Sequence, residues 1–204
     1  MTWEEDLRRH RSRKDQFLAT DPHSPLPPAA RDGFDGLDYF PPNEALRFEL
    51  ELREFDEAES VTVETTRDGS QSFREWGEFE FDVGDETVTL TAFRHAPDED
   101  GLWVPFRDET NGESTYPAGR YLDLEGDDRL DDGRWVLDFN RAYSPFCAFD
   151  DSYECPLIPR ENWLDVPIRA GEKHLEVDAG DAAGERHGGV LSRAIRAVRD
   201  ALST

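Results

Sequence analysis

The sequence predicts a mainly β fold, an antiparallel β-barrel or sandwich with an N-terminal and a C-terminal α-helix. Apolar residues alternate with polar ones in about seven short segments. Helical periodicity, in contrast, is confined to the two ends of the chain. The length of 204 residues suits one domain with a single core. We therefore expect one domain over 1–204, made of a helix at 1–20, a proline-rich linker at 21–42, a β core at 43–178 and a helix at 185–204.

The N-terminal helix is predicted to begin with a capping box, because Thr2 and Glu5 have the required spacing. Residues of one helix face then recur up to about Ala19, namely Trp3, Leu7, His10, Lys14, Phe17 and Leu18. Four prolines between Pro22 and Pro28 remove backbone donors and fix φ. The helix must end before them, and an extended linker follows.

From Leu46 onward the hydrophobic period changes to two, which is typical of half-buried strands. The predicted strands are centred on Leu46–Leu52, Val61–Val63, Phe79–Val83, Val88–Ala92, Leu102–Phe106, Leu122–Leu124 and Trp135–Phe139. A tight turn is expected at Gly84 and Asp85. Between Phe139 and Asp165 the pattern lapses into a proline- and aromatic-rich loop, which at this length is expected to be functional or well packed.

The predicted C-terminal helix is amphipathic. Its apolar stripe is opposed by Arg193, Arg196 and Arg199. Docking of this basic face on the acidic body is expected. Binding to an anionic membrane is the alternative, but the helix is short and lacks anchoring aromatic residues, so we expect no membrane partner.

The charge balance predicts a halophilic protein with an acidic surface. The chain carries 47 acidic and 23 basic residues, a net charge of −24. Molar salt screens the self-repulsion over about 3 Å, against about 8 Å at physiological ionic strength. We therefore expect unfolding to become easier as salt is withdrawn, and expect the cytoplasm of a salt-accumulating cell as the setting.

The same composition argues against several classes of binding partner. The acidic residues spread along the whole chain, whereas an acidic patch for a basic partner or a DNA mimic would gather them on one face. Nucleic-acid binding is not expected, because a net-acidic body repels phosphates and lacks a basic stripe. No apolar run approaches the ~20 residues of a membrane span. The N-terminus lacks the basic-then-apolar order of a signal peptide, so a cytoplasmic location is expected.

Polar side chains concentrate between the predicted strands of the second half, and we take them as the candidate ligand site. The candidates are Arg107, Asp108, Tyr116, Arg120, Asp138, Asn140, Arg141 and Tyr143. In one interpretation they converge in an otherwise aromatic barrel lumen and bind a small molecule. In the other they form a buried Arg–Asp network, such as Arg120 with Asp138, that braces the long loop. Arg120 follows Gly119, whose missing side chain permits close backbone approach or positive φ, so Arg120 is expected to be the most sensitive position.

A second functional hypothesis is a non-enzymatic interaction module that uses the aromatic loop 143–163. An exposed apolar patch over Phe146, Phe149, Tyr153 and Trp163 would favour it. Whether the protein is an enzyme stays open. The chain has no Gly-x-Ser-x-Gly elbow, phosphate loop or dinucleotide fingerprint. No catalytic residue, cofactor or oligomeric state is assigned.

The two cysteines, Cys147 and Cys155, do not predict a metal site, because structural zinc takes four ligands. A disulfide is uncommon in the cytoplasm, so we expect two buried free thiols near each other. Glu172 and His174 could share a strand face, but no third ligand can be named. We therefore predict no metal.

Four motifs carry a resemblance to a known family. They are the run Tyr116-Pro-Ala-Gly-Arg-Tyr-Leu122, the segment Asp138–Tyr143 with Pro145 and Cys147, the segment Tyr153–Pro156 with Pro159 and Asn162, and the segment Val166–Lys173. With these motifs the chain resembles the family of domain of unknown function 1684, from the first helix through Lys173. The resemblance implies a grouping and no mechanism.

Overall fold

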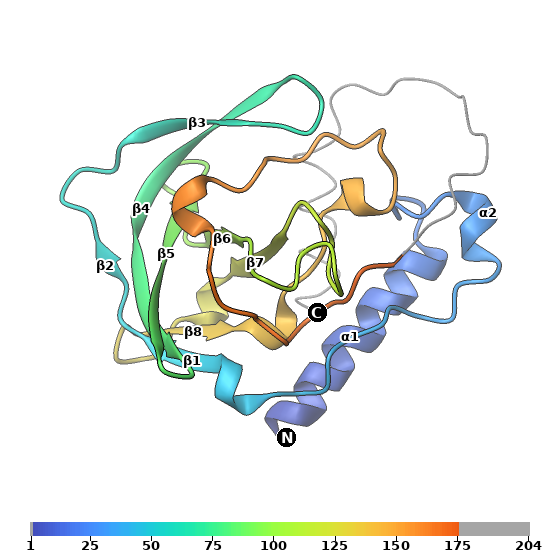
Figure 1. The fold of residues 1–204 in the computed structure, drawn as a ribbon, viewed down its shortest axis with the longest axis horizontal. Helices are drawn as coiled ribbons and strands as arrows, with labels where there is room; N and C mark the ends of the chain where they lie inside the picture. Colours follow the sequence, from blue (N-terminus) through green and yellow to red (C-terminus); the bar gives the residue numbers. More distant parts are fainter. Residues whose placement is uncertain (1, 176–204) are drawn as a thin grey trace.

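The computed structural model describes residues 2–175, and they form two antiparallel sheets and an N-terminal helix (Figure 1). The mainly β prediction is confirmed at this level. Within these residues the strands do not close into a barrel, which corrects the barrel alternative. The predicted helix at 185–204 lies outside the described residues.

The larger sheet has six strands in the order β2-β4-β5-β6-β7, with β3 also paired to β4. Their bounds are β2 (Arg53–Glu54), β3 (Ser60–Glu64), β4 (Ser70–Val83), β5 (Glu86–Arg94), β6 (Leu102–Phe106) and β7 (Arg120–Leu124). The smaller sheet pairs β1 (Arg47–Leu50) with β8 (Trp135–Asp138). Gly84, with φ of +64°, makes the predicted tight turn between β4 and β5.

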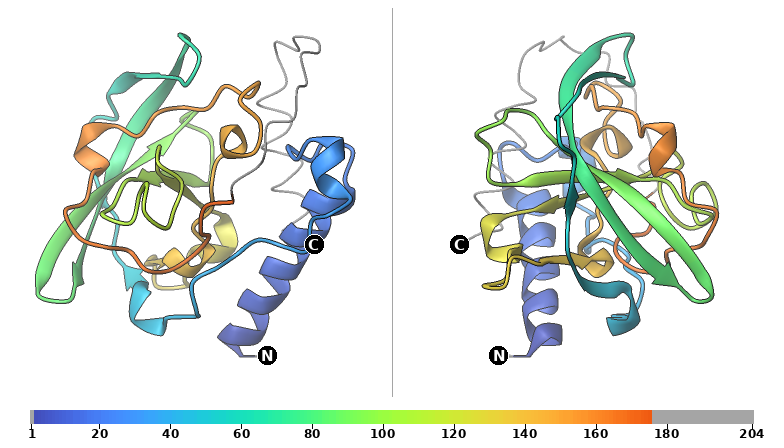
Figure 2. Two further views of the ribbon diagram at one scale, coloured as in Figure 1. Left: turned by 45° about the vertical axis from the view of Figure 1, so that its right-hand side comes forward. Right: turned by 90° about the vertical axis from the view of Figure 1, so that its left-hand side faces the viewer.

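Helix α1 (Trp3–Thr20) begins with the predicted capping box, in which Thr2 and Glu5 cap each other's backbone. It lies on the side of the molecule opposite β4 and β5 (Figures 1 and 2). The segment after it is more than an extended linker. It contains a short helix, α2 (Pro28–Arg31), and its Leu26 is buried in a cluster with Phe17 and Leu18 of α1.

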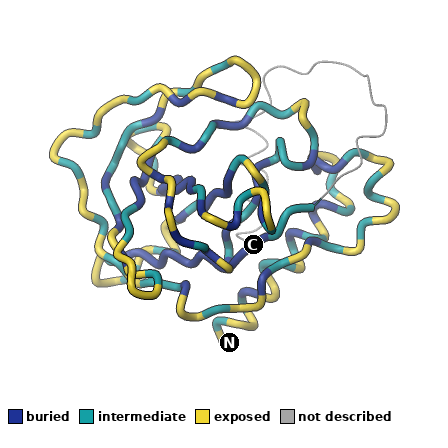
Figure 3. The backbone as a smooth tube through the Cα atoms, viewed as in Figure 1, coloured by how far each residue is buried: buried dark blue, intermediate teal, exposed yellow. Residues whose placement is uncertain are grey.

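The six-stranded sheet is covered on both faces. Alternate residues such as Val104 and Leu122 belong to the main core, which also receives side chains of the β1–β8 sheet. Their neighbours Trp103 and Tyr121 belong to a second cluster on the other face. Buried residues gather in the centre of the molecule and exposed residues in the outer turns (Figure 3).

The long loop after β8 is well packed. It contains three short 3-10 helices, η3 (Phe139–Arg141), η4 (Phe146–Ala148) and η5 (Arg160–Asn162). Phe149 and Leu164 are buried, and the fully buried side chain of Asn162 bonds to backbone of β5 and β6. Two further 3-10 turns, η1 (Glu44–Leu46) and η2 (Gly126–Asp128), precede β1 and follow β7.

Candidate functional site

The eight predicted site residues do not line one common pocket. The structure divides them among separate places, each with its own protein partners. Arg120 and Asp108 form one group, and Asp138 and Asn140 form a second beside helix α1. The side chains of the other four, Arg141, Tyr143, Tyr116 and Arg107, contact different partners.

Arg120 is a fully buried brace. Its guanidinium donates to the Asp108 carboxylate, with Nη2 2.6 Å from Oδ2. It also donates to the backbone carbonyls of Ile168, Ala170 and Glu172, and so ties the chain around 168–172 to β7. Asp108 in turn accepts from the Thr110 amide at 2.7 Å. Burial lowers the pKa of Arg120, and the Asp108 carboxylate opposes that shift.

The predicted pairing of Arg120 with Asp138 is therefore wrong, because Arg120 pairs with Asp108. Phe106 lies opposite Arg120 in the β6–β7 register, which brings Asp108, two residues beyond Phe106, beside the guanidinium. Gly119 makes the close approach possible. Its φ is +108°, and a Cβ there would lie 2.8 Å from the Phe106 carbonyl oxygen and 2.7 Å from Ile158 Cγ1.

Asp138 and Asn140 hold helix α1 in place. The strand predicted over Trp135–Phe139 ends at Asp138, because this side chain caps η3 by accepting from the Asn140 amide at 3.0 Å. Asn140 therefore does not share a strand face with Asp138. The Trp3 indole donates to Asp138 Oδ2 at 2.7 Å, and Arg11 donates to the Asn140 carbonyl at 3.3 Å. This polar group therefore binds helix α1 of the same chain.

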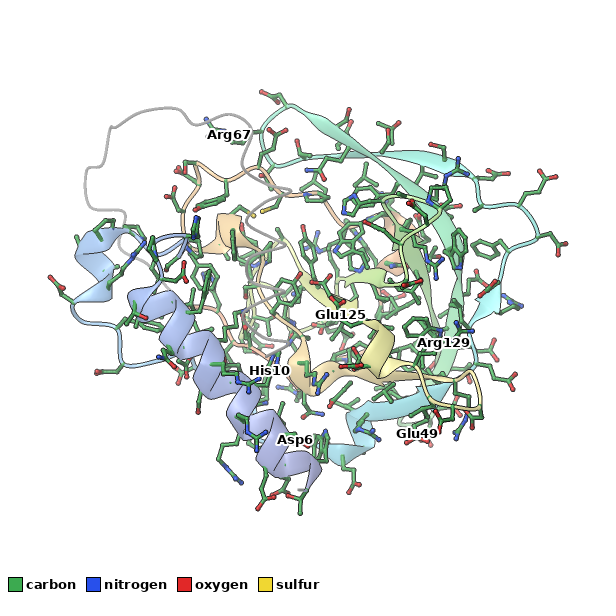
Figure 4. The ribbon with its side chains drawn as sticks, turned by 180° about the vertical axis from the view of Figure 1, so that it is seen from behind. Asp6, His10, Glu49, Arg67, Glu125 and Arg129 are labelled. Carbon is green, nitrogen blue, oxygen red and sulfur yellow. The ribbon has the colours of Figure 1, made fainter. Side chains whose placement is uncertain are left out.

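His10 lies on the side of α1 that faces the rest of the molecule (Figure 4), where four basic side chains act on its charge. Burial, together with the nearby positive charges of Arg141, Lys14, Arg11 and Arg13, lowers the pKa of His10 to about 3. Arg141 itself donates to Asp128 at 3.0 Å. The imidazole is neutral at ordinary pH.

Tyr143 links the helix to the second face of the six-stranded sheet. Its hydroxyl donates to Asp123 at 2.7 Å, and Lys14 Nζ lies 4.7 Å from the centre of its ring. Lys14 also forms a buried ion pair with Glu172, whose other carboxylate oxygen accepts from the Ser144 amide. Glu172 thus serves a structural ion pair. Among residues 2–175 no group of three metal-ligating side chains is placed to hold an ion.

A small pocket opens beside Tyr143 on this second face, with a volume of about 50 Å³. Its wall comes from β4, β6, β7 and the segments that flank them. The lining residues are Gln71, Phe73, His95, Glu99, Gly101, Leu102, Trp103, Tyr121, Asp123, Tyr143 and Pro156. Tyr143 is the one predicted site residue among them.

Aromatic rings and carboxylates dominate this pocket. Trp103 stacks on Phe73 at 4.5 Å between ring centres, and its ring meets Tyr121 edge-on at 5.1 Å. Asp123 and Glu99 supply two carboxylates, and the lining contains no Lys or Arg. The wall offers π-faces and negative charge, which together favour a cation.

The sequence held a signal for the second covered face on which this pocket lies, although not for the pocket itself. Every residue of β6 is buried, so the strand is covered on both faces. Trp103 on β6 and Tyr121 and Asp123 on β7 occupy the alternate positions that face away from the main core. A strand that is apolar at all positions indicates two covered faces.

The remaining predicted residues contact loop side chains. Arg107 stacks its guanidinium 4.4 Å from the centre of the Trp163 ring. The Tyr116 hydroxyl lies 3.7 Å from Cys147 Sγ. Cys147 and Cys155 are free thiols near each other, as predicted, but Cys155 is buried and Cys147 is only half-buried.

The aromatic loop does not present the apolar patch that an interaction module needs. Phe149 is buried, and Phe146 packs against Phe17 of α1 and Tyr153. Within residues 2–175 Trp163 is the sole exposed large hydrophobic side chain, at 44%. A single exposed residue is common on any protein surface.

No helix in the described part of the chain combines the length and apolar character that a bilayer crossing requires.

These features define a mainly β protein with two antiparallel sheets, a helix docked on polar loops, and a small aromatic pocket. Residues 32–173 match the family described as protein of unknown function (DUF1684), and the chain belongs to this family. It is similar to an uncharacterized protein from Haloarcula marismortui solved by solution NMR. The two share 45% identity over 84% of this chain and 94% of that chain, with a TM-score of 0.66. No curated protein matches the chain.

Proposed function

We propose that the protein binds a small organic cation, an ammonium group bearing short alkyl substituents, in the aromatic pocket on the second face of the six-stranded sheet. The observation that carries the proposal is the make-up of the wall. Four aromatic rings, a histidine and two carboxylates line it, without a single Lys or Arg. A cation over an aromatic face gains about 0.5–2 kcal/mol, and a desolvated site is at the upper end.

The size of the pocket supports a small ligand or the head group of a larger one. Its volume of about 50 Å³ admits a compact group. Sites for drug-sized molecules enclose roughly 300–1,000 Å³. The net charge of −24 adds a field that attracts cations toward the protein.

Binding is favoured over acid–base catalysis. Burial raises the pKa of both Tyr121 and Tyr143, and the Asp123 carboxylate raises that of Tyr143 further. Both phenols stay protonated at neutral pH and act as hydrogen-bond donors, Tyr121 to the Pro156 carbonyl and Tyr143 to Asp123. Neither can serve as a general base there.

We place this activity in the cytoplasm of a salt-accumulating cell. The acidic composition supports this setting, and so does the haloarchaeal source of the similar structure. A binding site that works against molar inorganic cations needs a feature those ions cannot exploit. Alkyl groups that pack on aromatic rings provide such a feature.

The proposal is tested by titration with tetramethylammonium chloride, followed by amide chemical shifts in NMR spectra at constant total chloride. tert-Butanol, neutral and of similar shape, is the matched probe. We expect tetramethylammonium to shift the amides of β6 and β7 near Trp103 and Asp123 and to bind at least about tenfold more tightly than tert-butanol.

Asp123→Asn is the diagnostic variant because it removes the charge and keeps an acceptor for Tyr143. This variant should bind tetramethylammonium more weakly than the parent does and bind tert-butanol equally well. Asp85→Asn removes the same charge at the exposed β4–β5 turn and should change neither. Equal binding of the two probes, or an Asp123→Asn variant that binds like the parent, would refute a cation site.

A further inference from the structure

The two cysteines form a contact pair within the long loop that follows β8. The Cys147 amide donates to Cys155 Sγ at 3.4 Å, and the two thiols hydrogen-bond to each other. The Tyr116 hydroxyl lies 3.7 Å from Cys147 Sγ and donates to it. Cys147 is half-buried and Cys155 is buried. Cys147 is therefore the more exposed residue of the pair.

The surroundings make the two thiols unequal. The hydrogen bond from the Cys155 thiol lowers the pKa of Cys147, burial opposes this shift, and the Tyr116 hydroxyl adds to it. Donation to Cys147 raises the pKa of Cys155, and burial raises it further. Thiolate is the reactive form of cysteine. Cys147 is thus the thiol of the pair that is favoured to react first. Cys155 lies beside it and stays protonated more readily.

The segment that carries Cys155 is tied to the β3–β4 turn. The Cys155 amide donates to Thr66 Oγ1 at 3.1 Å, and its carbonyl accepts from the Thr66 amide at 2.9 Å. Arg67, at the top of Figure 4, donates to the Ser152 carbonyl. Cys155 is therefore anchored, whereas Cys147 lies in the short turn η4. A bond between the sulfurs, which needs about 2.05 Å, requires a local shift of η4.

We propose that Cys147 and Cys155 form a reactive dithiol site that low-molecular-weight disulfides oxidise to an intramolecular disulfide. Cys147 attacks one sulfur of a disulfide RSSR. A Cys147–SR bond forms, the S–S bond of the reagent breaks, and one RSH leaves with the Cys147 proton. Cys155 then attacks Cys147 Sγ, which releases the second RSH with the Cys155 proton. The two protein thiols lose two electrons in total, and RSSR gains them.

The test treats the folded full-length chain in molar salt with hydroxyethyl disulfide and follows intact mass after acid quench. The chain has two cysteines, so the internal disulfide, a single mixed disulfide, a double adduct and a disulfide-linked dimer differ in mass. We expect the parent to lose two hydrogens without retaining an adduct, at a rate independent of protein concentration. Cys155→Ser should accumulate a stable mixed disulfide on Cys147. Cys147→Ser should react at least about tenfold more slowly than Cys155→Ser.

Peptide mapping of the parent at early times makes the outcome independent of whether a variant folds. The first adduct is expected on Cys147. A first adduct on Cys155, a persistent mixed disulfide in the parent, or reaction only after addition of denaturant would each overturn the proposal. Disulfide-linked dimers in place of the internal bond would also overturn it.

Discussion

Strand β7 presents two neighbouring side chains to two different environments, and the contrast explains where a ligand can bind. Arg120 faces inward, where protein atoms accept four of its hydrogen bonds. Tyr121 faces the second cluster, where a pocket remains between the rings. The polar residues around Arg120 therefore form a structural brace. The pocket lies on the other face of β7.

The largest expected effect tests the brace. Arg120→Ala removes the partner of a fully buried carboxylate, and this should lower the free energy of unfolding by about 3–5 kcal/mol. Chemical unfolding in molar salt measures it. Arg134→Ala is the matched control, because that side chain is 38% exposed and its ion pairs lie at the surface. Its change should stay within about 0.5 kcal/mol. An Arg120→Ala variant as stable as the Arg134→Ala variant would exclude a brace.

A smaller effect is expected at Gly119, which sets the approach of β7 to β6. Gly119→Ala combines the cost of a positive φ with contacts of 2.7 Å and 2.8 Å. Gly112→Ala is the matched control, because Gly112 has φ of +81° and no atom within 4 Å of the added Cβ. We expect the free energy of unfolding to fall by about 1 kcal/mol in the control and by about 2–4 kcal/mol in Gly119→Ala. Thermal and chemical unfolding measure both losses. If Gly119→Ala and Gly112→Ala lost the same amount of stability, the close contact at Gly119 would have no energetic cost.

A pH titration tests the packing of α1 on the loops. The pKa of His10 in the folded protein is lowered to about 3, below the unfolded value of 6.5, so the unfolded chain binds the proton first as the pH falls. The contribution to stability is complete above pH 6.5 and is lost progressively as the pH falls toward 3. Between pH 7 and pH 5 we expect a loss of about 1–2 kcal/mol that is absent in His10→Gln.

The control for that titration is His23→Gln, because His23 is exposed and lies after the end of α1. It should keep the parent's pH dependence between pH 7 and pH 5. If His10→Gln kept it as well, the pKa of His10 in the folded protein would not be lowered, and the burial of His10 between α1 and Arg141 would be wrong.

Local patterns in the sequence predicted most of the strands and the start of α1, because alternation and capping depend on neighbouring residues. The partner of Arg120 could not be predicted, since it depends on the register that places Phe106 opposite it. The end of β8 was missed for a local reason, the capping of η3 by Asp138. The pocket depends on which strands are neighbours, and strand order cannot be read from the spacing of Trp103 and Asp123.

The comparison of the two faces is tested most directly by one pair of variants measured in two ways. Asp108→Asn and Asp123→Asn remove the same charge on opposite sides of the sheet, and each is assayed for unfolding free energy and for tetramethylammonium affinity. We predict that Asp108→Asn loses stability while its folded fraction binds like the parent. Asp123→Asn should stay within about 1 kcal/mol of the parent in stability and lose binding. The reverse assignment, with affinity lost at Asp108 and retained at Asp123, would contradict the account.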